Sequence, residues 1–151
     1  EIACWDILGQ YLKVPIYQLL GGKVRDKVKV YANGWYSGER SPENFAEKAK
    51  FLSNKGYQAL KFDPFGSEHL RLDKKSEIFI KQIVRSVREA VGPNVELMIE
   101  GHKRFNVFEA IKIAKWLDEF DVTWFEDPID NDDIDSFSRL HSKLLLYHLY
   151  E

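Results

Sequence analysis

The chain has 151 residues, and its hydrophobic fraction of 44% is ordinary for a globular protein. Its 22 basic and 24 acidic side chains leave no broad basic field, which argues against nucleic acid as a partner. No apolar run approaches the roughly 20 residues that a membrane-spanning helix needs, so we expect no membrane partner either.

The first 27 residues predict two short helices. Ile7, Leu8 and Tyr11 recur at helical spacing, and a Gly-Gly pair at residues 21–22 is a natural helix stop. Cys4 belongs to the same apolar pattern, so we expect a buried small hydrophobe rather than a nucleophile. As the only cysteine it cannot form an internal disulfide, and with no signal peptide predicted we expect a cytoplasmic protein. Because the sequence starts without Met, we expect it to begin inside a longer natural chain.

From residue 28 onward the chain alternates strand and helix patterns four times, at about 30 residues per unit. Short runs of β-branched and aromatic side chains predict buried strands, and longer amphipathic segments predict helices. The expected strands are residues 28–31, 59–62, 95–99 and 122–125, and the expected helices are residues 42–55, 73–90, 107–120 and 134–140. Repeated strand–helix units predict right-handed crossovers and a parallel sheet.

A doubly wound sheet and a (β/α)8 barrel, the TIM barrel, both fit this alternation. No Gly-x-Gly-x-x-Gly motif opens a helix, which weakens the dinucleotide-binding form of the doubly wound sheet. A complete barrel has about 250 residues, so residues 28–143 are expected to form about its first four βα units. Residues 144–151 are more uniformly bulky than the earlier strands and form an atypical tail, a candidate fifth strand. We therefore expect the chain to be incomplete.

Two of the predicted strands end on a carboxylate. Glu100 closes the third strand and Glu126 closes the fourth, 26 residues later. Neighbouring parallel strands lie about 4.8 Å apart, so side chains at matching ends can reach one ion. Oxygen ligands of this kind select Mg²⁺ or another hard divalent cation. Either residue alone is better interpreted as a solvated sheet-edge acid, but the pair in register favours a shared metal site.

Three more side chains are candidates for chemistry. His102 follows Glu100 by two residues, so both side chains project to one side if the strand continues, and an imidazole there could protonate a leaving group. An exposed loop histidine fits the spacing equally well. Lys61 near the end of the second strand could hold a substrate carboxylate or act as a base, unless it is an ordinary surface lysine. Asp63 follows on the same face.

These motifs resemble the mandelate racemase/muconate lactonizing enzyme branch of the enolase superfamily, and in particular its acid-sugar dehydratases of the galactonate dehydratase type. Residues 5–10 and 15–22 resemble the lead-in segment of the family's barrel. Residues 59–65, 100–102 and 124–128 resemble the ends of its second, third and fourth strands. Several ordered motifs at matching spacing make the resemblance specific.

The resemblance implies a fold and a mechanism. Residues 1–27 become lead-in helices that connect to a missing N-terminal capping domain. The family removes the proton α to a carboxylate, with Mg²⁺ stabilising the resulting charge, and its dehydratases then expel a β-hydroxyl as water. Glu100 and Glu126 match its first two metal ligands, His102 its general acid, and Lys61 a lysine that binds the substrate carboxylate. Full-length relatives are expected to be homo-oligomers acting on small sugar acids.

Departures from the family pattern keep alternatives open. Asp63 replaces a second lysine, the usual base of the racemases, which favours dehydration over racemisation or epimerisation and leaves Asp63 as a substrate-binding candidate. The third metal ligand and the later histidine–aspartate base have no counterpart before residue 151. The competing hypothesis is therefore a catalytically inactive fragment, and we expect the chain to be inactive alone. A nucleic-acid or protein-binding module is the least favoured alternative.

Overall fold

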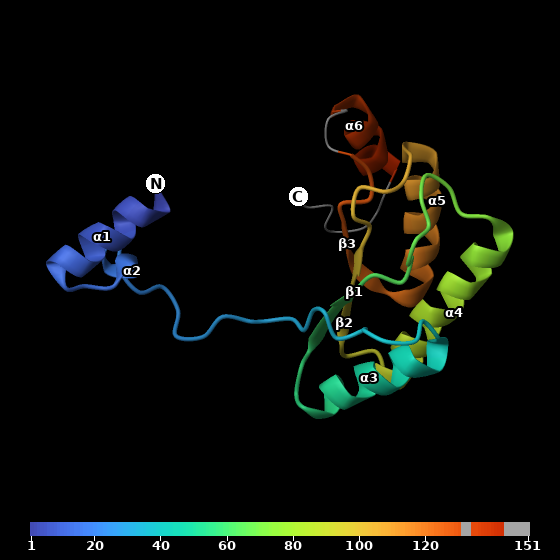
Figure 1. Ribbon diagram of the computed structural model, residues 1–151, viewed down its shortest axis with the longest axis horizontal. Helices are drawn as coiled ribbons and strands as arrows, with labels where there is room; N and C mark the ends of the chain where they lie inside the picture. Colours follow the sequence, from blue (N-terminus) through green and yellow to red (C-terminus); the bar gives the residue numbers. More distant parts are fainter. Residues whose placement is uncertain (131–133, 144–151) are drawn as a thin grey trace.

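The structure is a computed structural model that describes residues 1–130 and 134–143. Figure 1 shows its elements from blue at the N-terminus to red. In chain order they are α1 (Ile2–Leu12), α2 (Ile16–Leu19), α3 (Pro42–Asn54), β1 (Ala59–Phe62), α4 (Lys74–Val91), β2 (Glu96–Glu100), α5 (Val107–Leu117), the 3₁₀ turn η1 (Asp118–Phe120), β3 (Val122–Glu126) and α6 (Ile134–Lys143). The candidate fifth strand at 144–151 lies outside the described residues.

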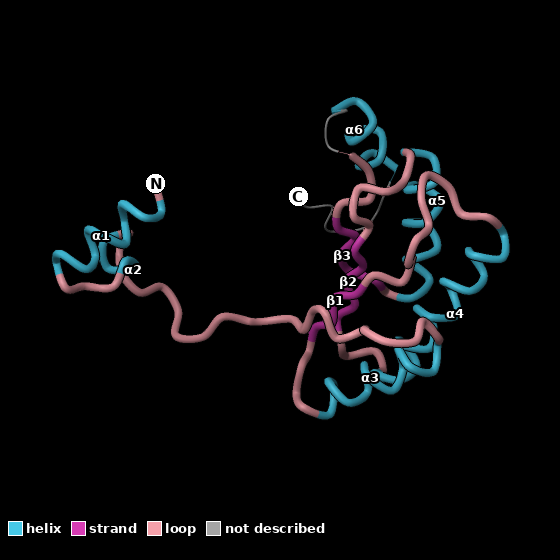
Figure 2. Tube along the Cα trace, viewed as in Figure 1, coloured by secondary structure: helices cyan, strands magenta, loops and turns pink. Residues whose placement is uncertain are grey.

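The three strands form a parallel sheet in the order β1-β2-β3, with α3, α4 and α5 on one side of it (Figures 1 and 2). A helix between each pair of parallel strands is the crossover that the alternation predicted. The parallel sheet and its crossover helices confirm the expected mixed α/β class, and the three described strands form an open sheet. Within the described part, no helix is long and apolar enough to cross a membrane.

The core lies between the sheet and its helices. Side chains on the helix-covered face of the strands are completely buried; they are Leu60, Phe62, Leu97, Ile99 and Phe125. On the opposite face, Met98 and Trp124 are only half-buried. Alternate residues of a strand point to opposite faces, so this contrast shows that the helices cover one face. The other is the face that the interior of a barrel would enclose.

The predicted first strand is wrong as a regular element. Residues 28–31 make no strand, and pairing begins only at Ala32, which forms an isolated parallel bridge with Leu60. The Ala32 amide donates to the Ala59 carbonyl at 3.0 Å, and the Lys61 amide donates to the Ala32 carbonyl at 2.8 Å. Val28 and Val30 are 72% and 64% exposed, so these β-branched side chains do not join the core.

Three helix starts follow from local chemistry. The Ser41 hydroxyl accepts from the Asn44 amide at 3.3 Å and caps α3. Asp73 caps α4 in the same way, and Asn106 caps α5 through two amides. Such caps satisfy amides that have no partner in the first turn. They fix where the helices start after the loops at the carboxyl ends of the strands.

The N-terminal helices lie apart from the sheet. The α1 and α2 helices pack against each other, and an extended segment joins them to the rest of the molecule (Figure 1). Ile7 and Tyr11 are 66% and 81% exposed. Cys4 is also exposed, so the expectation of a buried cysteine is wrong. The predicted helix is confirmed, but no described element covers its apolar face.

Candidate functional site

The carboxyl edge of the sheet brings together three charged side chains that the sequence singled out. Glu100 and Glu126 are direct partners in the β2–β3 ladder, and Lys61 pairs with Met98 in the β1–β2 ladder. The Lys61 Nζ lies 2.6 Å from Glu100 Oε2 and also forms an ion pair with Glu126 Oε1. The ammonium group therefore bridges two carboxylates that belong to two different strands.

This cluster is partly closed to water. The side chains of Lys61 and Glu100 are 5% and 9% exposed, whereas that of Glu126 is 26% exposed. Burial by itself would lower the pKa of Lys61, but its hydrogen bonds to Glu100 and Glu126 outweigh burial and raise that pKa above its usual value. Lys61 is therefore a cation at neutral pH, held in place by two anions.

Glu126 is oriented from a second direction. The Trp124 indole N–H donates to Glu126 Oε2 at 3.1 Å, while Oε1 faces Lys61. Trp124 and Glu126 alternate on one strand and so share the face opposite the helices. One oxygen of the carboxylate thus has an indole donor and the other has an ammonium donor, which defines the plane of the group.

A glycine allows the β2 and β3 ends to meet. The Gly101 amide donates to the Glu126 carbonyl at 2.8 Å, which extends the ladder by one bond. A Cβ at residue 101 would lie 2.7 Å from the Asp127 carbonyl oxygen and 2.9 Å from the Pro128 Cα. Backbone on the neighbouring loop cannot move aside as a flexible side chain can. Glycine is therefore required where the two carboxylates come into register.

His102 reaches the cluster by a different route from the one expected. The strand ends at Glu100, and His102 and Lys103 both adopt left-handed backbone with φ of 51° and 57°. The premise of a continuing strand is therefore wrong. The turn instead lets the His102 amide donate to Glu100 Oε1 at 3.0 Å and places Nδ1 3.6 Å from that oxygen. Non-glycine residues in this region carry strain, which often occurs at functional sites.

Asp63 also lies at this edge, directly after β1. Its Oδ1 accepts from the Phe65 amide at 2.8 Å, and its Oδ2 lies 3.6 Å from His102 Nε2. The imidazole of His102 is thus flanked by Glu100 on one nitrogen and by Asp63 on the other. Sequence reasoning placed Asp63 on the same side as Lys61, but it did not foresee the approach to His102.

Two residues at the edge were not singled out from the sequence. Arg104 donates to Asp63 Oδ2, and its only sequence signal is its place two residues after His102. Tyr36 stands next to the same charges; burial raises the pKa of its phenol, and the negative charges of Asp63 and Glu100 raise it further. Its signal was the aromatic pair at residues 35–36, just past the predicted first strand.

The donor set suits a hard divalent cation in kind. Glu100 and Glu126 offer adjacent carboxylates, and the ammonium between them shows that positive charge is accommodated there. No group of three or more His, Cys, Asp or Glu side chains that could hold a metal occurs within residues 1–130 and 134–143. Two carboxylates would leave an Mg²⁺ ion largely hydrated.

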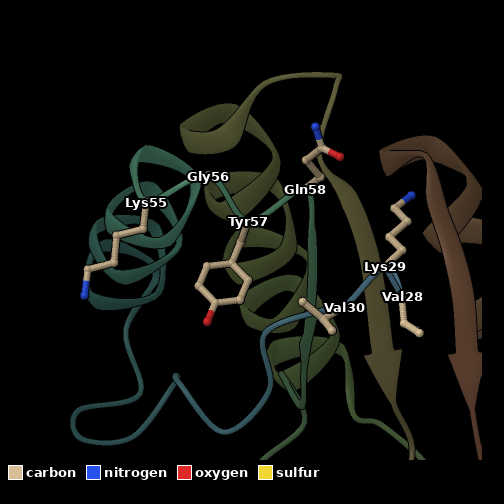
Figure 3. A pocket seen from close by; sticks show the side chains of 7 residues that line it. All are labelled: Val28, Lys29, Val30, Lys55, Gly56, Tyr57 and Gln58. Atoms are coloured by element: carbon tan, nitrogen blue, oxygen red, sulfur yellow. The ribbon is translucent and has the colours of Figure 1, made fainter. Parts of the chain in front are cut away.

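The hollow shown in Figure 3 is a different place. It has a volume of about 440 Å³ and lies beside Gln58, where the chain enters β1, at the end of the sheet opposite the charged cluster. Lys29 on its wall forms an ion pair with Glu96 at the start of β2. Tyr57 and Lys55 lie on its other side, and Val28 and Val30 come from the extended segment. It contains none of the predicted site residues.

Comparison with known proteins places this geometry in context. The sequence profile of the family described as enolase C-terminal domain-like matches residues 44–146. D-gluconate dehydratase of Thermoproteus tenax is 44% identical over 142 residues, which are 94% of this chain and 29% of that enzyme. D-gluconate/D-galactonate dehydratase of Picrophilus torridus is 43% identical over 129 residues, 85% of this chain and 33% of that enzyme.

A solved structure agrees. A member of the enolase superfamily from Salmonella Typhimurium superposes with a TM-score of 0.89 at 27% identity, covering 96% of this chain and 42% of that one. This chain spans about a third of the length of the curated relatives above.

Proposed function

Because this chain belongs to the enolase C-terminal domain-like family, we propose that it forms part of an Mg²⁺-dependent acid-sugar dehydratase. The observation that carries the proposal is the in-register pair of Glu100 and Glu126 around the Lys61 ammonium. Adjacent strand-end carboxylates are costly unless a cation compensates them. The barrel enzymes of this architecture place their chemistry at the same carboxyl edge.

In this proposal Glu100 and Glu126 hold the metal. Mg²⁺, when bound, supplies the positive charge that stabilises the negative charge developing on a substrate carboxylate as its α proton is removed. Lys61 contributes a second positive charge next to that position and binds the substrate carboxylate. Its burial at 5% exposure excludes competing water, which strengthens the attraction.

His102 serves as the acid that protonates the departing β-hydroxyl. Its side chain is 57% exposed at the open edge, where a substrate can approach. Asp63, the substrate-binding candidate, presents carboxylate oxygens on the same side for substrate hydroxyls. Asp63 also replaces the lysine that the family's racemases use as a base, so the charge arrangement favours loss of water over racemisation.

The proposal concerns a protein of the relatives' length. Residues 1–27 and 28–143 act in it as lead-in helices and as the first half of a barrel, in a cytoplasmic homo-oligomer. The 151-residue chain by itself is proposed to be inactive, because the later-strand base that the family uses has no match in this sequence. In this proposal the chain contributes the metal ligands, the lysine and the general acid, but not the general base.

Calorimetric titration with Mg²⁺ tests the metal site. We expect weak binding by the chain and at least tenfold weaker binding by Glu126→Gln, because the amide keeps the shape of the side chain but loses its charge. Glu96→Gln is the matched control, since Glu96 lies at the other end of β2 and its side chain forms an ion pair with exposed Lys29. Equal Mg²⁺ affinity in the wild type and Glu126→Gln would show that the site lies elsewhere.

Activity is tested by loss of water from a panel of hexonate and hexarate acids, read as 2-keto-3-deoxy product. In a protein of the relatives' length that carries these residues, His102→Asn should lower turnover about 10²–10⁴-fold, the usual contribution of a general acid. Metal-dependent product from the purified 151-residue chain would contradict the proposed inactivity of the chain alone.

A further inference from the structure

Arg104 joins the loops that follow β1 and β2. Its Nε donates to the Gly101 carbonyl at 3.0 Å, its Nη1 donates to the Gly66 carbonyl, and its Nη2 donates to Asp63 Oδ2. The side chain is 16% exposed, and its guanidinium lies over the Phe65 ring, 5.8 Å from the ring centroid. Since each nitrogen of the guanidinium already has a protein acceptor, Arg104 is built to hold these loops together.

Asp63 passes this constraint on to His102. Its Oδ1 is fixed by the Phe65 amide, and its Oδ2, which accepts from Arg104, is the same atom that lies 3.6 Å from His102 Nε2. That separation is too long for a hydrogen bond. The direction of the Asp63 carboxylate therefore decides whether Nε2 has an anion beside it, and Arg104 decides that direction.

The side chain of His102 has few contacts of its own that could fix its orientation. Its side chain is 57% exposed, so packing alone does not select a rotamer, and its backbone sits in the left-handed region. Its described polar neighbours are Glu100, close to Nδ1, and Asp63, close to Nε2. Glu100 already forms an ion pair with Lys61 and accepts a hydrogen bond from the His102 amide.

We infer that Arg104 is a positioning residue which, acting through Asp63, holds the His102 imidazole against the carboxyl edge of the sheet. The consequence for proton transfer rests on the role proposed for His102, but the orientation itself does not. Arg104, on the loop after β2, supplies the positive charge that neutralises Asp63 on the loop after β1.

The test is NMR of the 151-residue chain, with the χ1 rotamer of His102 measured from three-bond couplings. We expect one dominant rotamer in the wild type and averaging over at least two in Arg104→Lys, because an ammonium cannot span the three acceptors. Asp63→Asn should give the same averaging while keeping an oxygen for the Phe65 amide. The double variant should be no worse than either single one, as expected for residues that act in series.

Arg88→Lys is the matched control. Its guanidinium also bridges loops, donating to the carbonyls of Gly92, Val95, Phe120 and Asp121, but at the opposite end of the strands. Arg88→Lys should leave the His102 rotamer unchanged, with the amide shifts of β1 and β2 reporting that the sheet is intact in every variant. A fixed His102 rotamer in both Arg104→Lys and Asp63→Asn, or equal averaging in Arg88→Lys, would overturn the inference.

Kinetics separate positioning from substrate binding. In a protein of the relatives' length that carries these residues, Arg104→Lys should lower kcat about 10–100-fold, the scale expected for a small misplacement of a reacting group, with KM within about twofold. A raised KM at unchanged kcat would make Arg104 a substrate ligand and contradict the inference. Absence of dehydration in the wild type would count against the proposed function alone, because the rotamer measurement needs no turnover.

Discussion

The N-terminal helices α1 and α2 differ from the sheet region, which consists of strands β1–β3 and their covering helices α3–α5. Both regions contain regularly spaced apolar residues, but only the sheet region buries them. In α1 an apolar stripe recurs at helical spacing, yet Ile7 and Tyr11 remain 66% and 81% exposed. In the sheet region equally apolar side chains such as Phe62 and Ile99 are completely buried. Periodicity therefore predicts which face of an element is apolar, whereas burial needs a second element within reach.

The largest expected difference is in core packing. Phe62 is fully buried and its ring centroid lies 5.4 Å from that of Trp35 and 6.0 Å from that of Phe45. Phe62→Ala should lower the free energy of unfolding by about 3–5 kcal/mol through lost burial and the cavity left behind. Tyr11→Ala, on the exposed stripe of α1, should change it by less than about 0.5 kcal/mol. Urea unfolding monitored by circular dichroism measures both, and similar losses would remove the contrast between the two regions.

The next largest difference is expected between a buried and an exposed charge pair. Lys61→Met leaves Glu100 and Glu126 side by side without their shared cation and should cost about 2 kcal/mol, because an unpaired buried charge is strongly unfavourable. Lys29→Met is the control, since Lys29 in the extended segment pairs with Glu96 in the open and should cost well under about 1 kcal/mol. The measurement is the urea midpoint at neutral pH without divalent cations. Equal costs would mean that the cluster is as solvated as the surface pair.

The pair of Glu77 and Lys112 should make the stability of the sheet region depend on pH. The hydrogen bond from Lys112 lowers the pKa of the Glu77 carboxyl below its usual value of 4.5, despite the opposing effect of burial. Its contribution is therefore present above that pH and is lost as the pH falls through the lowered pKa. Lys112→Gln should cost less than about 1 kcal/mol at pH 7 and should flatten the fall in stability between pH 5 and pH 3. Urea midpoints at pH 7, 5 and 3 check this, and an unchanged acid slope would contradict it.

The smallest effect is expected from removing the helices altogether. Within the described chain, α1 and α2 contact mainly each other, so deletion of residues 1–22 should change the stability of the sheet region by less than about 0.5 kcal/mol. Amide hydrogen exchange of β1 and β2 gives the measurement. Loss of protection in those strands would show that the N-terminal segment stabilises the sheet, which would contradict the independence of the two regions.

Elements that depend on local chemistry could be predicted from short stretches of the chain. Strand–helix alternation predicted α3 to α6 and the parallel sheet, and the strand-end motifs predicted the meeting of Lys61, Glu100 and Glu126 at one edge. These features follow from periodicity, capping and the rule that parallel strands end together, all of which are read within short stretches of chain.

Strand pairing and side-chain contacts between residues distant in sequence could be seen only in the tertiary structure. Residues 28–31 have strand-forming side chains but form no strand, and backbone pairing begins only at Ala32, because pairing needs a register with β1 that no local pattern specifies. His102 reaches Glu100 through a left-handed turn rather than a continued strand. Arg104 meets Asp63 across 41 positions of sequence, because the β1 and β2 loops emerge side by side. The partners of His102, Asp63 and Arg104 depend on how the loops after β1 and β2 pack, and no spacing along the chain encodes those contacts.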